Sequence, residues 1–399
     1  MMADWKELTV GDLCDTISDT YHRNDDEVVL VNTSDVLEGK ILNHQAVENK
    51  NLKGQFKKTF KKDDILYSEI RPANKRYAYV DFEETERYIA STKLMVLRPK
   101  TDVVLPRFLF AFLSSNHVLA ELQHLAETRS GTFPQITFSS ELAPMPIEVP
   151  DFETQERIVG MLSSIEGRIQ NNNAINENLQ EQARSIFQSW FIDYEPFGGA
   201  TPSDWHLSTL GQVAIMKTDS WSPAKNPDVV VEHYSIPAFD EQHYPVFEIA
   251  SGIKSNKYIL TPDSLMISKL NPDTKRIWRP VCLSEHPVCS TEFIVYEAKK
   301  NGQRDYIYSL IDSIPFFNHL CSHTTGSTNS RQRATPKTTL EFSFLLPPDS
   351  VIEEFCHIVT PMYDLIASNI VENQTLAKTR DSLLPRLMSG ELDVSDLDL

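Results

Sequence analysis

The chain has 399 residues, of which 41% are hydrophobic and 24% are charged, a composition typical of globular proteins with two or three domains. Its apolar runs are too short to cross a membrane, and its first residues lack the basic and apolar regions of a signal peptide, so we expect a cytoplasmic protein with no membrane partner. The formal net charge of −18 argues against non-specific binding of nucleic acid, and the five scattered cysteines argue against a disulfide framework.

The first 150 residues contain runs of β-branched and aromatic residues that are typical of strands, such as Ile65–Ser68 and Leu94–Leu97. A helical stretch is expected near Phe108–Leu125 because apolar residues recur there at helical spacing. The segment Arg129–Gln135 is rich in polar residues and contains a glycine, which indicates an exposed loop. Together these features predict a mixed α+β domain over residues 1–150.

A long amphipathic helix is predicted for residues 151–197. Apolar residues recur there at alternating spacings of four and three, which is the heptad pattern of paired helices. Two asparagines interrupt the apolar stripe, and polar residues at such positions commonly fix the register of the pair. The expected seam positions are Ile158, Leu162, Ile165, Ile169, Asn172, Asn176, Leu179 and Ile186.

Residues 198–348 repeat the pattern of the first 150 residues. Most matching positions are 200 residues apart, and the offset drifts to 199 and then 198 towards the end of the copy. An offset held over separate patches indicates an internal duplication, so a second α+β domain is expected, with an exposed loop at Thr324–Lys337. The matching pairs include Trp5 and Trp205, Gly11 and Gly211, Ile65–Ser68 and Leu265–Ser268, Lys75-Arg76 and Lys275-Arg276, and Leu142 and Leu340.

Positive charge is concentrated in equivalent parts of the two copies. Residues 50–107 hold 14 Lys and Arg against 8 Asp and Glu, and residues 254–337 hold 12 against 7. Either basic island alone is consistent with solvated surface charge. Matched islands in both copies are harder to attribute to chance.

A second long helix is predicted for residues 349–399. Ser350 and Glu353 have the spacing of a capping box, and Pro361 and Pro385 are expected to break the helix near its start and its end. Antiparallel pairing of the two helices would bury both stripes and hold the two domains apart, whereas the alternative is that each helix packs only on its own domain. The expected seam positions in this helix are Ile366, Ile370, Asn373 and Leu384.

The predicted fold class is therefore α+β, with two pseudo-symmetric mixed α/β domains separated by two long antiparallel, coiled-coil-like helices. No catalytic residue and no metal site is expected in it. Asn226–Asp228 and Asn271–Asp273 lack the second proline and the aromatic residue of an aminomethyltransferase motif. Asp263 and Lys269 lack the second carboxylate of a nuclease centre, and His319–His323 lacks a further pair of zinc ligands.

Two helix ends carry a family resemblance. Arg380–Leu392 resembles the helix end typical of specificity subunits of type I restriction-modification enzymes, and Ser185–Phe197 resembles its first-repeat version. Pro150–Ile158 resembles the opening of the first conserved helix of that family, and Trp205–Gly211 resembles the entry to its second recognition domain. The resemblance covers the whole chain as an architecture and is strongest at the helices. The second helix departs from the pattern, because Glu353-Glu354 replaces the usual Gln-Glu start.

The resemblance implies a non-catalytic subunit that recognises a bipartite, asymmetric double-stranded DNA target. It implies assembly with two methyltransferase subunits and with restriction and translocase subunits. It further implies that S-adenosylmethionine, ATP and Mg²⁺ belong to those partners and that this chain holds no cofactor. Residues 1–150 and 198–348 would be the target-recognition domains, and residues 151–197 and 349–399 the spacer helices.

Candidate DNA-binding residues are the polar side chains of the basic islands and predicted loops. Arg suits bidentate contacts with guanine, Asn and Gln suit adenine, and Lys suits phosphates. Lys75-Arg76 and Lys275-Arg276 are equivalent in the two copies and are expected to contact the DNA backbone, whereas the differing loops are expected to read bases. The candidates are Arg71, Asn74, Lys75, Arg76, Arg129, Thr132, Gln135, Asn271, Lys275, Arg276, Arg279, Arg331, Gln332 and Arg333.

Two other interpretations stay open on the sequence alone. The chain could be a stand-alone DNA methyltransferase or nuclease whose motifs have diverged. It could also be a helical scaffold protein without a DNA role, whose helices and acidic faces recruit partners.

Overall fold

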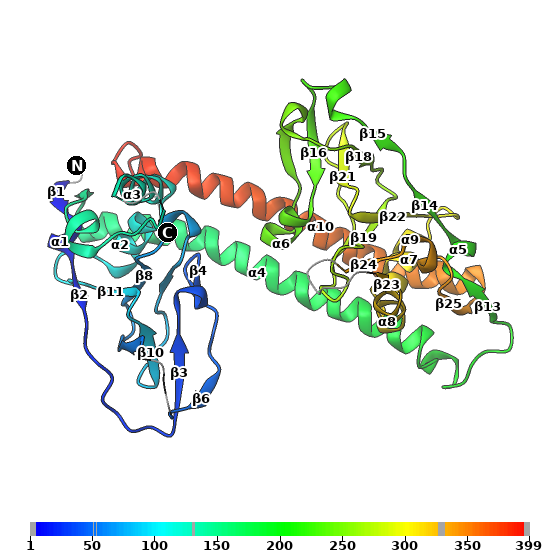
Figure 1. Cartoon of the computed structure of the whole chain (residues 1–399), viewed down its shortest axis with the longest axis horizontal. Helices are drawn as coiled ribbons and strands as arrows, with labels where there is room; N and C mark the ends of the chain where they lie inside the picture. The colour runs from blue at the N-terminus through cyan, green and yellow to red at the C-terminus, as the bar shows by residue number, and fades with distance from the viewer. Residues whose placement is uncertain (1–4, 51, 53, 130–131, 326–331, 395–399) are drawn as a thin grey trace. The chain divides into compact units, whose positions relative to one another are not determined.

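The computed structural model describes residues 5–50, 52, 54–129, 132–325 and 332–394 (Figure 1). The chain forms two compact units: unit 1 comprises residues 1–169 and 374–399, and unit 2 comprises residues 170–373. Both boundaries fall inside long helices, α4 (Phe152–Phe191) and α10 (Asp349–Met388), so each unit consists of one globular half and part of each helix. Among the described residues, no helix is both long and apolar enough to span a membrane.

The globular part of unit 1 is built from short strands and helices. Its strands form a central antiparallel sheet (β2-β11-β8-β9), an outer sheet (β6-β3-β10-β7) and two small ribbons (β1-β12 and β4-β5). The strands are β1 (Lys6–Thr9), β2 (Cys14–Ile17), β3 (Glu27–Val31), β4 (Val36–Leu37), β5 (Lys40–Ile41), β6 (Ala46–Glu48), β7 (Phe56–Lys58), β8 (Ile65–Ser68), β9 (Tyr77–Tyr79), β10 (Tyr88–Ser91), β11 (Leu94–Pro99) and β12 (Pro146–Val149). The α-helices are α1 (Val10–Leu13), α2 (Pro106–Leu113) and α3 (Asn116–Arg129).

The globular part of unit 2 is built in the same way. Its sheets are β14-β22-β19-β20 and β15-β18-β21-β16-β17, with ribbons β13-β25 and β23-β24. The strands are β13 (His206–Thr209), β14 (Ala214–Lys217), β15 (Ser220–Trp221), β16 (Val230–Tyr234), β17 (Val246–Ile249), β18 (Lys257–Ile259), β19 (Leu265–Ser268), β20 (Ile277–Trp278), β21 (Pro287–Ser290), β22 (Phe293–Ala298), β23 (Thr324–Thr325), β24 (Arg333–Ala334) and β25 (Ser343–Leu346). The α-helices are α5 (Leu210–Val213), α6 (Ile236–Gln242), α7 (Arg304–Asp312), α8 (Ile314–Ser322) and α9 (Pro336–Thr339).

The two units share one topology, as expected for a duplicated sequence. The sheet β2-β11-β8-β9 corresponds to β14-β22-β19-β20, and the parallel pair β3 and β10 corresponds to the parallel pair β16 and β21. The ribbon β1-β12 corresponds to β13-β25, and the helix pair α2 and α3 corresponds to α7 and α8. The fold is α+β, as the sequence predicted.

The central strand of each unit is buried on both faces. In β8, Ile65 and Tyr67 pack into the core formed with α2 and the long helices, whereas Leu66 packs into the core under the outer sheet. Alternate side chains of a strand point to opposite faces, which explains why a continuous apolar run is needed here. In β19, Leu265 and Met266 divide between the two cores in the same way.

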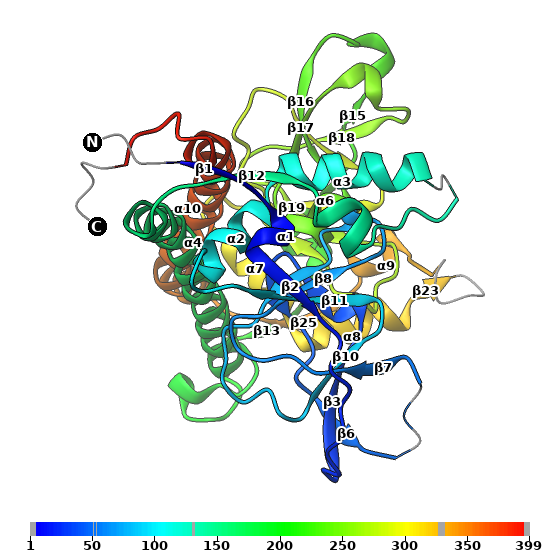
Figure 2. The same cartoon turned by 90° about the vertical axis from the view of Figure 1, so that its left-hand side faces the viewer.

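The two long helices pair in antiparallel orientation within each unit, as predicted. In unit 1, Ile158 near the start of α4 shares a core with Leu384 near the end of α10, and Figure 2 shows the two coils side by side there. In unit 2, Phe187 near the end of α4 packs against Phe355 near the start of α10. All the expected seam side chains, of both helices, are buried or half-buried.

Asparagines form a hydrogen-bonded ladder between the helices in unit 2. The Asn172 amide donates to the Asn373 side-chain oxygen at 2.9 Å, and the Asn373 amide donates to Asn173 at 2.9 Å. One turn along, the Asn369 amide donates to Asn176 at 2.8 Å. Asn172 and Asn369 are only 1% and 5% exposed, so these bonds satisfy polar groups that water does not reach.

The expectation that Pro361 and Pro385 break the second helix is wrong, because α10 continues unbroken through both. Each proline lies on the exposed side of the helix, so water can bond the carbonyl that the missing N–H leaves free. The buried residues Val359 and Tyr363 hold the helix on both sides of Pro361. The helix begins at Asp349, so Ser350 lies inside the first turn and does not form the expected capping box.

The helical stretch expected near residues 108–125 consists of two helices. The α2 helix ends at Leu113, and the Ser115 hydroxyl accepts the Val118 N–H at 3.3 Å in the first turn of α3. The equivalent Ser313 accepts the Phe316 N–H at 3.4 Å in α8. Serine favours such N-terminal capping positions, and this signal was present in the sequence. The expected loop at 324–337 also contains β23, β24 and part of α9.

Candidate nucleic-acid interface

Three segments of unit 1 meet at the C-terminal end of β8 and are joined by main-chain hydrogen bonds. The Arg71 N–H donates to the Pro134 carbonyl at 3.1 Å, and the Ile136 N–H donates to the Glu69 carbonyl at 2.9 Å. The Glu69 N–H donates in turn to the Lys93 carbonyl at 3.0 Å. We call this meeting point the unit 1 junction: residues 69–71, 93 and 134–136. It brings the turn after β8 against the segment that follows α3.

Unit 2 contains the same junction, formed by residues 269–271, 292 and 332–334. The Asn271 N–H donates to the Gln332 carbonyl at 2.9 Å, and the Ala334 N–H donates to the Lys269 carbonyl at 2.8 Å. The Lys269 N–H donates to the Glu292 carbonyl at 2.9 Å. Every main-chain bond of the unit 1 junction therefore has a counterpart.

Both junctions contain a residue other than glycine in the left-handed backbone region. Arg71 has a φ of 46° and Asn271 has a φ of 47°. This conformation costs about 1 to 2 kcal/mol for most residues and somewhat less for asparagine. Backbone strain of this kind clusters at functional sites, where the surrounding structure holds it in place. In each unit the strained residue is the one whose N–H reaches across to the second segment.

The candidates of unit 1 divide into free and engaged side chains. Arg71, Asn74 and Thr132 are exposed, and Gln135 is half-buried at the junction. The remaining three candidates contact other parts of unit 1. Lys75 pairs with Glu38 at 3.0 Å, Arg76 donates to the Ser34 carbonyl at 2.9 Å, and Arg129 pairs with Glu141 at 3.0 Å.

Most candidates of unit 2 are held by carboxylates. Lys275 pairs with Asp312 at 2.7 Å, and Arg276 forms a bidentate pair with Asp240 at 2.6 and 2.8 Å. Arg333 pairs with Glu292 at 3.0 Å but keeps 47% of its side chain exposed, and Gln332 is half-buried. Arg331 lies outside the described residues.

Arg279 is a poor candidate for a DNA contact. Its guanidinium pairs with Asp305 at 2.7 Å and with Asp364 at 2.6 Å, and only 9% of the side chain is exposed. The guanidinium also lies over the Tyr363 ring. Arg279, Lys275 and Arg276 are thus engaged by carboxylates within unit 2, and DNA binding by these three residues stays a prediction.

Four junction residues were absent from the candidates drawn from the sequence. Glu69 and Lys93 form an ion pair at 3.1 Å in unit 1, and Lys269 and Glu292 occupy the equivalent positions in unit 2. The repeat offered a signal, because Thr92 and Thr291 match and are each followed by one of these residues. The contact across the junction is not visible in the sequence.

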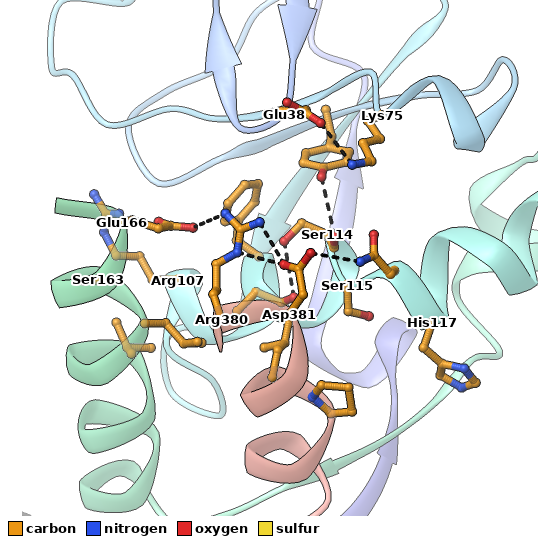
Figure 3. Close-up of a pocket in the computed structure, with 18 residues that line it drawn as sticks. Glu38, Lys75, Arg107, Ser114, Ser115, His117, Ser163, Glu166, Arg380 and Asp381 are labelled. Carbon is orange, nitrogen blue, oxygen red and sulfur yellow. Dashed lines mark hydrogen bonds and ion pairs between the residues drawn. The ribbon is translucent and has the colours of Figure 1, made fainter. Parts of the chain in front are cut away.

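Unit 1 also contains a cavity of about 200 Å³ between α2, α3 and the two long helices (Figure 3). Its charged groups are largely paired within it: Arg380 contacts Asp381 at 2.8 Å and Glu166 at 3.9 Å. The Asn116 amide donates to Asp381 at 3.3 Å, and Lys75 pairs with Glu38 at the edge. In unit 2 the position equivalent to Ser114 is Asp312, which is buried and pairs with Arg184 at 2.6 Å.

Groups that could act as nucleophiles or metal ligands do not converge in the described part of the chain. Burial raises the pKa of the Cys14 and Cys282 thiols to about 12 and that of Cys356 to about 11, so all three are neutral at pH 7. No cluster of three or more His, Cys, Asp or Glu side chains placed to hold a metal ion occurs among these residues. His319 and His323 each contact a main-chain carbonyl at 2.8 Å.

Comparison with known proteins identifies the family. A family model described as the type I restriction modification DNA specificity domain matches residues 2–181. The chain is 30% identical to the type I restriction enzyme HindI specificity subunit of Haemophilus influenzae, over 98% of this chain and all of that protein. It is 25% identical to the MjaIX specificity subunit of Methanocaldococcus jannaschii, over 74% of this chain and 71% of that protein.

Solved structures agree in fold. The crystal structure of a type I restriction-modification system S subunit from M. genitalium matches 97% of this chain and 96% of its own, with 16% identity and a TM-score of 0.52. At that identity the likeness concerns the fold alone. The similarity to the HindI subunit over the full length of both chains shows that this protein belongs to the specificity subunits of type I restriction-modification enzymes, the non-catalytic subunits that recognise the DNA target.

Proposed function

We propose that the chain recognises a bipartite, asymmetric double-stranded DNA target, with each globular half reading one half-site. The observation that carries this proposal is the repeated junction. Its main-chain bonds are the same in both units, whereas its side chains differ. A duplicated scaffold with different side chains at equivalent places suits two short half-sites of different sequence separated by bases that are not read.

DNA binding would depend on local positive charge, since the whole chain is strongly acidic. Residues 50–107 and 254–337, which contain the two junctions, carry the excess of Lys and Arg. Exposed Arg71, Asn74 and Arg333 lie at or beside the junctions and have the side chains that read guanine and adenine in the major groove. Contacts from partner subunits to phosphates would supply further affinity.

The same proposal assigns the long helices to assembly. Residues 151–195 hold 8 Asp and Glu against 3 Lys and Arg, and residues 349–399 hold 10 against 3, so their outer faces suit basic partner surfaces. Two methyltransferase subunits would dock on them, with restriction and translocase subunits joining the complex. S-adenosylmethionine, ATP and Mg²⁺ would bind to those partners, and the complex would act in the cytoplasm, where its DNA lies.

Exchange of one globular half tests the bipartite target. The chain would be expressed with its own methyltransferase partners, and methylated bases in the host DNA would be sequenced. Replacing residues 1–150 by those of a relative with another target should alter one half-site and leave the other unchanged. A single undivided target, or a change in both halves, would overturn the proposal.

A stand-alone enzyme is tested separately. The purified chain should transfer no methyl group from S-adenosylmethionine to DNA and should cleave no DNA, whereas the complex with methyltransferase subunits should methylate it. Activity of the purified chain alone would favour a diverged methyltransferase or nuclease. Assembly without any effect on the methylated sequence would favour a scaffold.

A further inference from the structure

The two junctions can be compared position by position because the duplication supplies an internal reference. Three main-chain hydrogen bonds join equivalent atoms in both, with lengths that differ by 0.2 Å or less. A bridge between Ile70 and Gln135 in unit 1 corresponds to one between Leu270 and Arg333 in unit 2. The backbone is thus the same, and only the side chains distinguish the two surfaces.

At four equivalent junction positions all the side chains are polar and every one differs. The unit 1 quartet is Glu69, Arg71, Lys93 and Gln135, and the unit 2 quartet is Lys269, Asn271, Glu292 and Arg333. At two of the four positions the sign of the charge is inverted. Glu69 is replaced by Lys269, and Lys93 is replaced by Glu292.

The ion pairs of the quartets contribute little to the stability of the junctions. The Lys93–Glu69 pair is 48% and 21% exposed, and the Arg333–Glu292 pair is 47% and 30% exposed. Exposed ion pairs of this kind have small effects on folding. Main-chain bonds hold the segments together in both units, whichever side chains are present. A structural role therefore does not explain the charged members of the quartets, whereas asparagine at position 271 also suits the left-handed backbone there.

The chemistry of the quartets matches the edges of base pairs. Lysine and arginine donate to O6 and N7 of guanine, glutamate accepts from the exocyclic amine of cytosine, and asparagine or glutamine pairs with adenine. An inverted charge at one position of a common backbone reverses the hydrogen-bonding pattern that the DNA must present there. Inversion at two neighbouring positions makes the two surfaces complementary to different base pairs.

We propose that the two quartets are the specificity determinants of the two half-sites, and that the inverted charges, Glu69 and Lys93 in unit 1 against Lys269 and Glu292 in unit 2, make them read different bases at the same position. The proposal rests on the bipartite recognition proposed above. Lys93 faces an acceptor edge, as in guanine, in one half-site. Glu292 faces an exocyclic amine, as in cytosine, at the corresponding position of the other.

The double variant E69K/K93E tests the proposal while keeping the ion pair. Lysine and glutamate exchange places, so the pair and the net charge of the unit are retained and only its direction is reversed. A matched control is K62E/E83K, which inverts the exposed Lys62–Glu83 pair beyond the opposite end of β8. Each chain would be purified in complex with its methyltransferase partners and used to select duplexes from a pool of randomised DNA.

The expected result is a change of base preference of about tenfold or more at one position of one half-site, the size of a good direct contact. The other half-site and the control should match the parent complex. An unchanged preference at both half-sites would overturn the inference while the bipartite target stands. A uniform loss of affinity for all sequences would also overturn it, since that is the signature of phosphate contacts.

Two further measurements make every outcome decisive. If E69K/K93E does not assemble, K93Q removes the charge without repulsion and should relax selection at the same single position; unaltered selection by K93Q would refute the proposal. If the parent complex selects one undivided sequence, the proposed function itself fails, and the inference fails with it. The parent selection therefore separates the two failures.

Discussion

Removal of the Arg279 side chain would separate a structural role from a DNA-binding role for this residue. In unit 2 the guanidinium lies between Asp305, which is 3% exposed, and Asp364, with bonds of 2.7 and 2.6 Å. In Arg279→Ala, Asp305 would keep the Arg304 guanidinium at 3.3 Å and the Thr360 hydroxyl at 2.7 Å. The buried carboxylate would lose its closest cation and keep a weaker one.

The size of the effect follows from that remaining environment. Breaking a buried ion pair by removing one partner costs about 3 to 5 kcal/mol. Because Arg304 and Thr360 still compensate Asp305, we expect the lower end, about 3 kcal/mol. For a unit of this size such a loss corresponds to a fall in Tm of roughly 6 to 12 °C.

The assay is thermal unfolding of the purified chain together with selection of DNA targets by its complex. The matched control is Lys300→Ala, which removes an exposed pair with Asp349 and should change stability by less than about 1 kcal/mol. Arg279→Ala should lower Tm and leave the selected sequence unchanged. Unchanged stability combined with a relaxed half-site would refute the reasoning, because Arg279 would then be a base contact.

Three further predictions concern stability. Asn172→Leu should destabilise unit 2 by about 0.5 to 1.5 kcal/mol in urea unfolding, since the half-buried acceptors Glu372 and Asn373 on α10 each lose a donor; an unchanged midpoint would contradict this. Burial lowers the pKa of His233, whose side chain is 13% exposed, and its contact with Glu248 only partly offsets this, so stability should fall as pH drops below the ordinary histidine pKa of about 6.5, where the unfolded chain takes up a proton more readily; His233→Gln should flatten that dependence in urea unfolding followed against pH. An added Cβ at Gly390, where φ is +69°, would lie 2.9 Å from Trp5, so Gly390→Ala should lower Tm more than Gly199→Ala, where φ is +74° and the space is open.

The sequence predicted those parts of the structure that depend on local periodicity. The spacing of Ile158, Leu162 and the residues that follow gave the helix and its buried stripe, and the offset between the copies gave the duplicated topology. Asn172 and Asn373 were expected in the seam, and they bond to each other. The partner of Asn176 was missed, because Asn369 lies just outside the heptad positions that the pattern selected.

The candidate site was harder to predict because its contacts join residues distant in the chain. The sequence did not show that Arg279 pairs with a carboxylate, because its partner Asp364 lies 85 residues further along the chain. Glu69 and Lys93 are 24 residues apart and meet only because β8 and β11 are neighbours in the sheet. For Pro361 the local signal was clear but insufficient. A proline does destabilise a helix locally, but burial of the residues around Pro361 outweighs that cost and the helix continues.

The main-chain bonding of the junctions has a consequence for how such proteins change over generations. Hydrogen bonds between N–H and carbonyl groups are indifferent to the side chains attached, so substitutions at the quartet positions leave the frame intact. Lineages can therefore drift between targets by single replacements without first passing through a poorly folded form. The core side chains of β8 and β19, by contrast, tolerate little change, so related proteins should remain similar in sequence there.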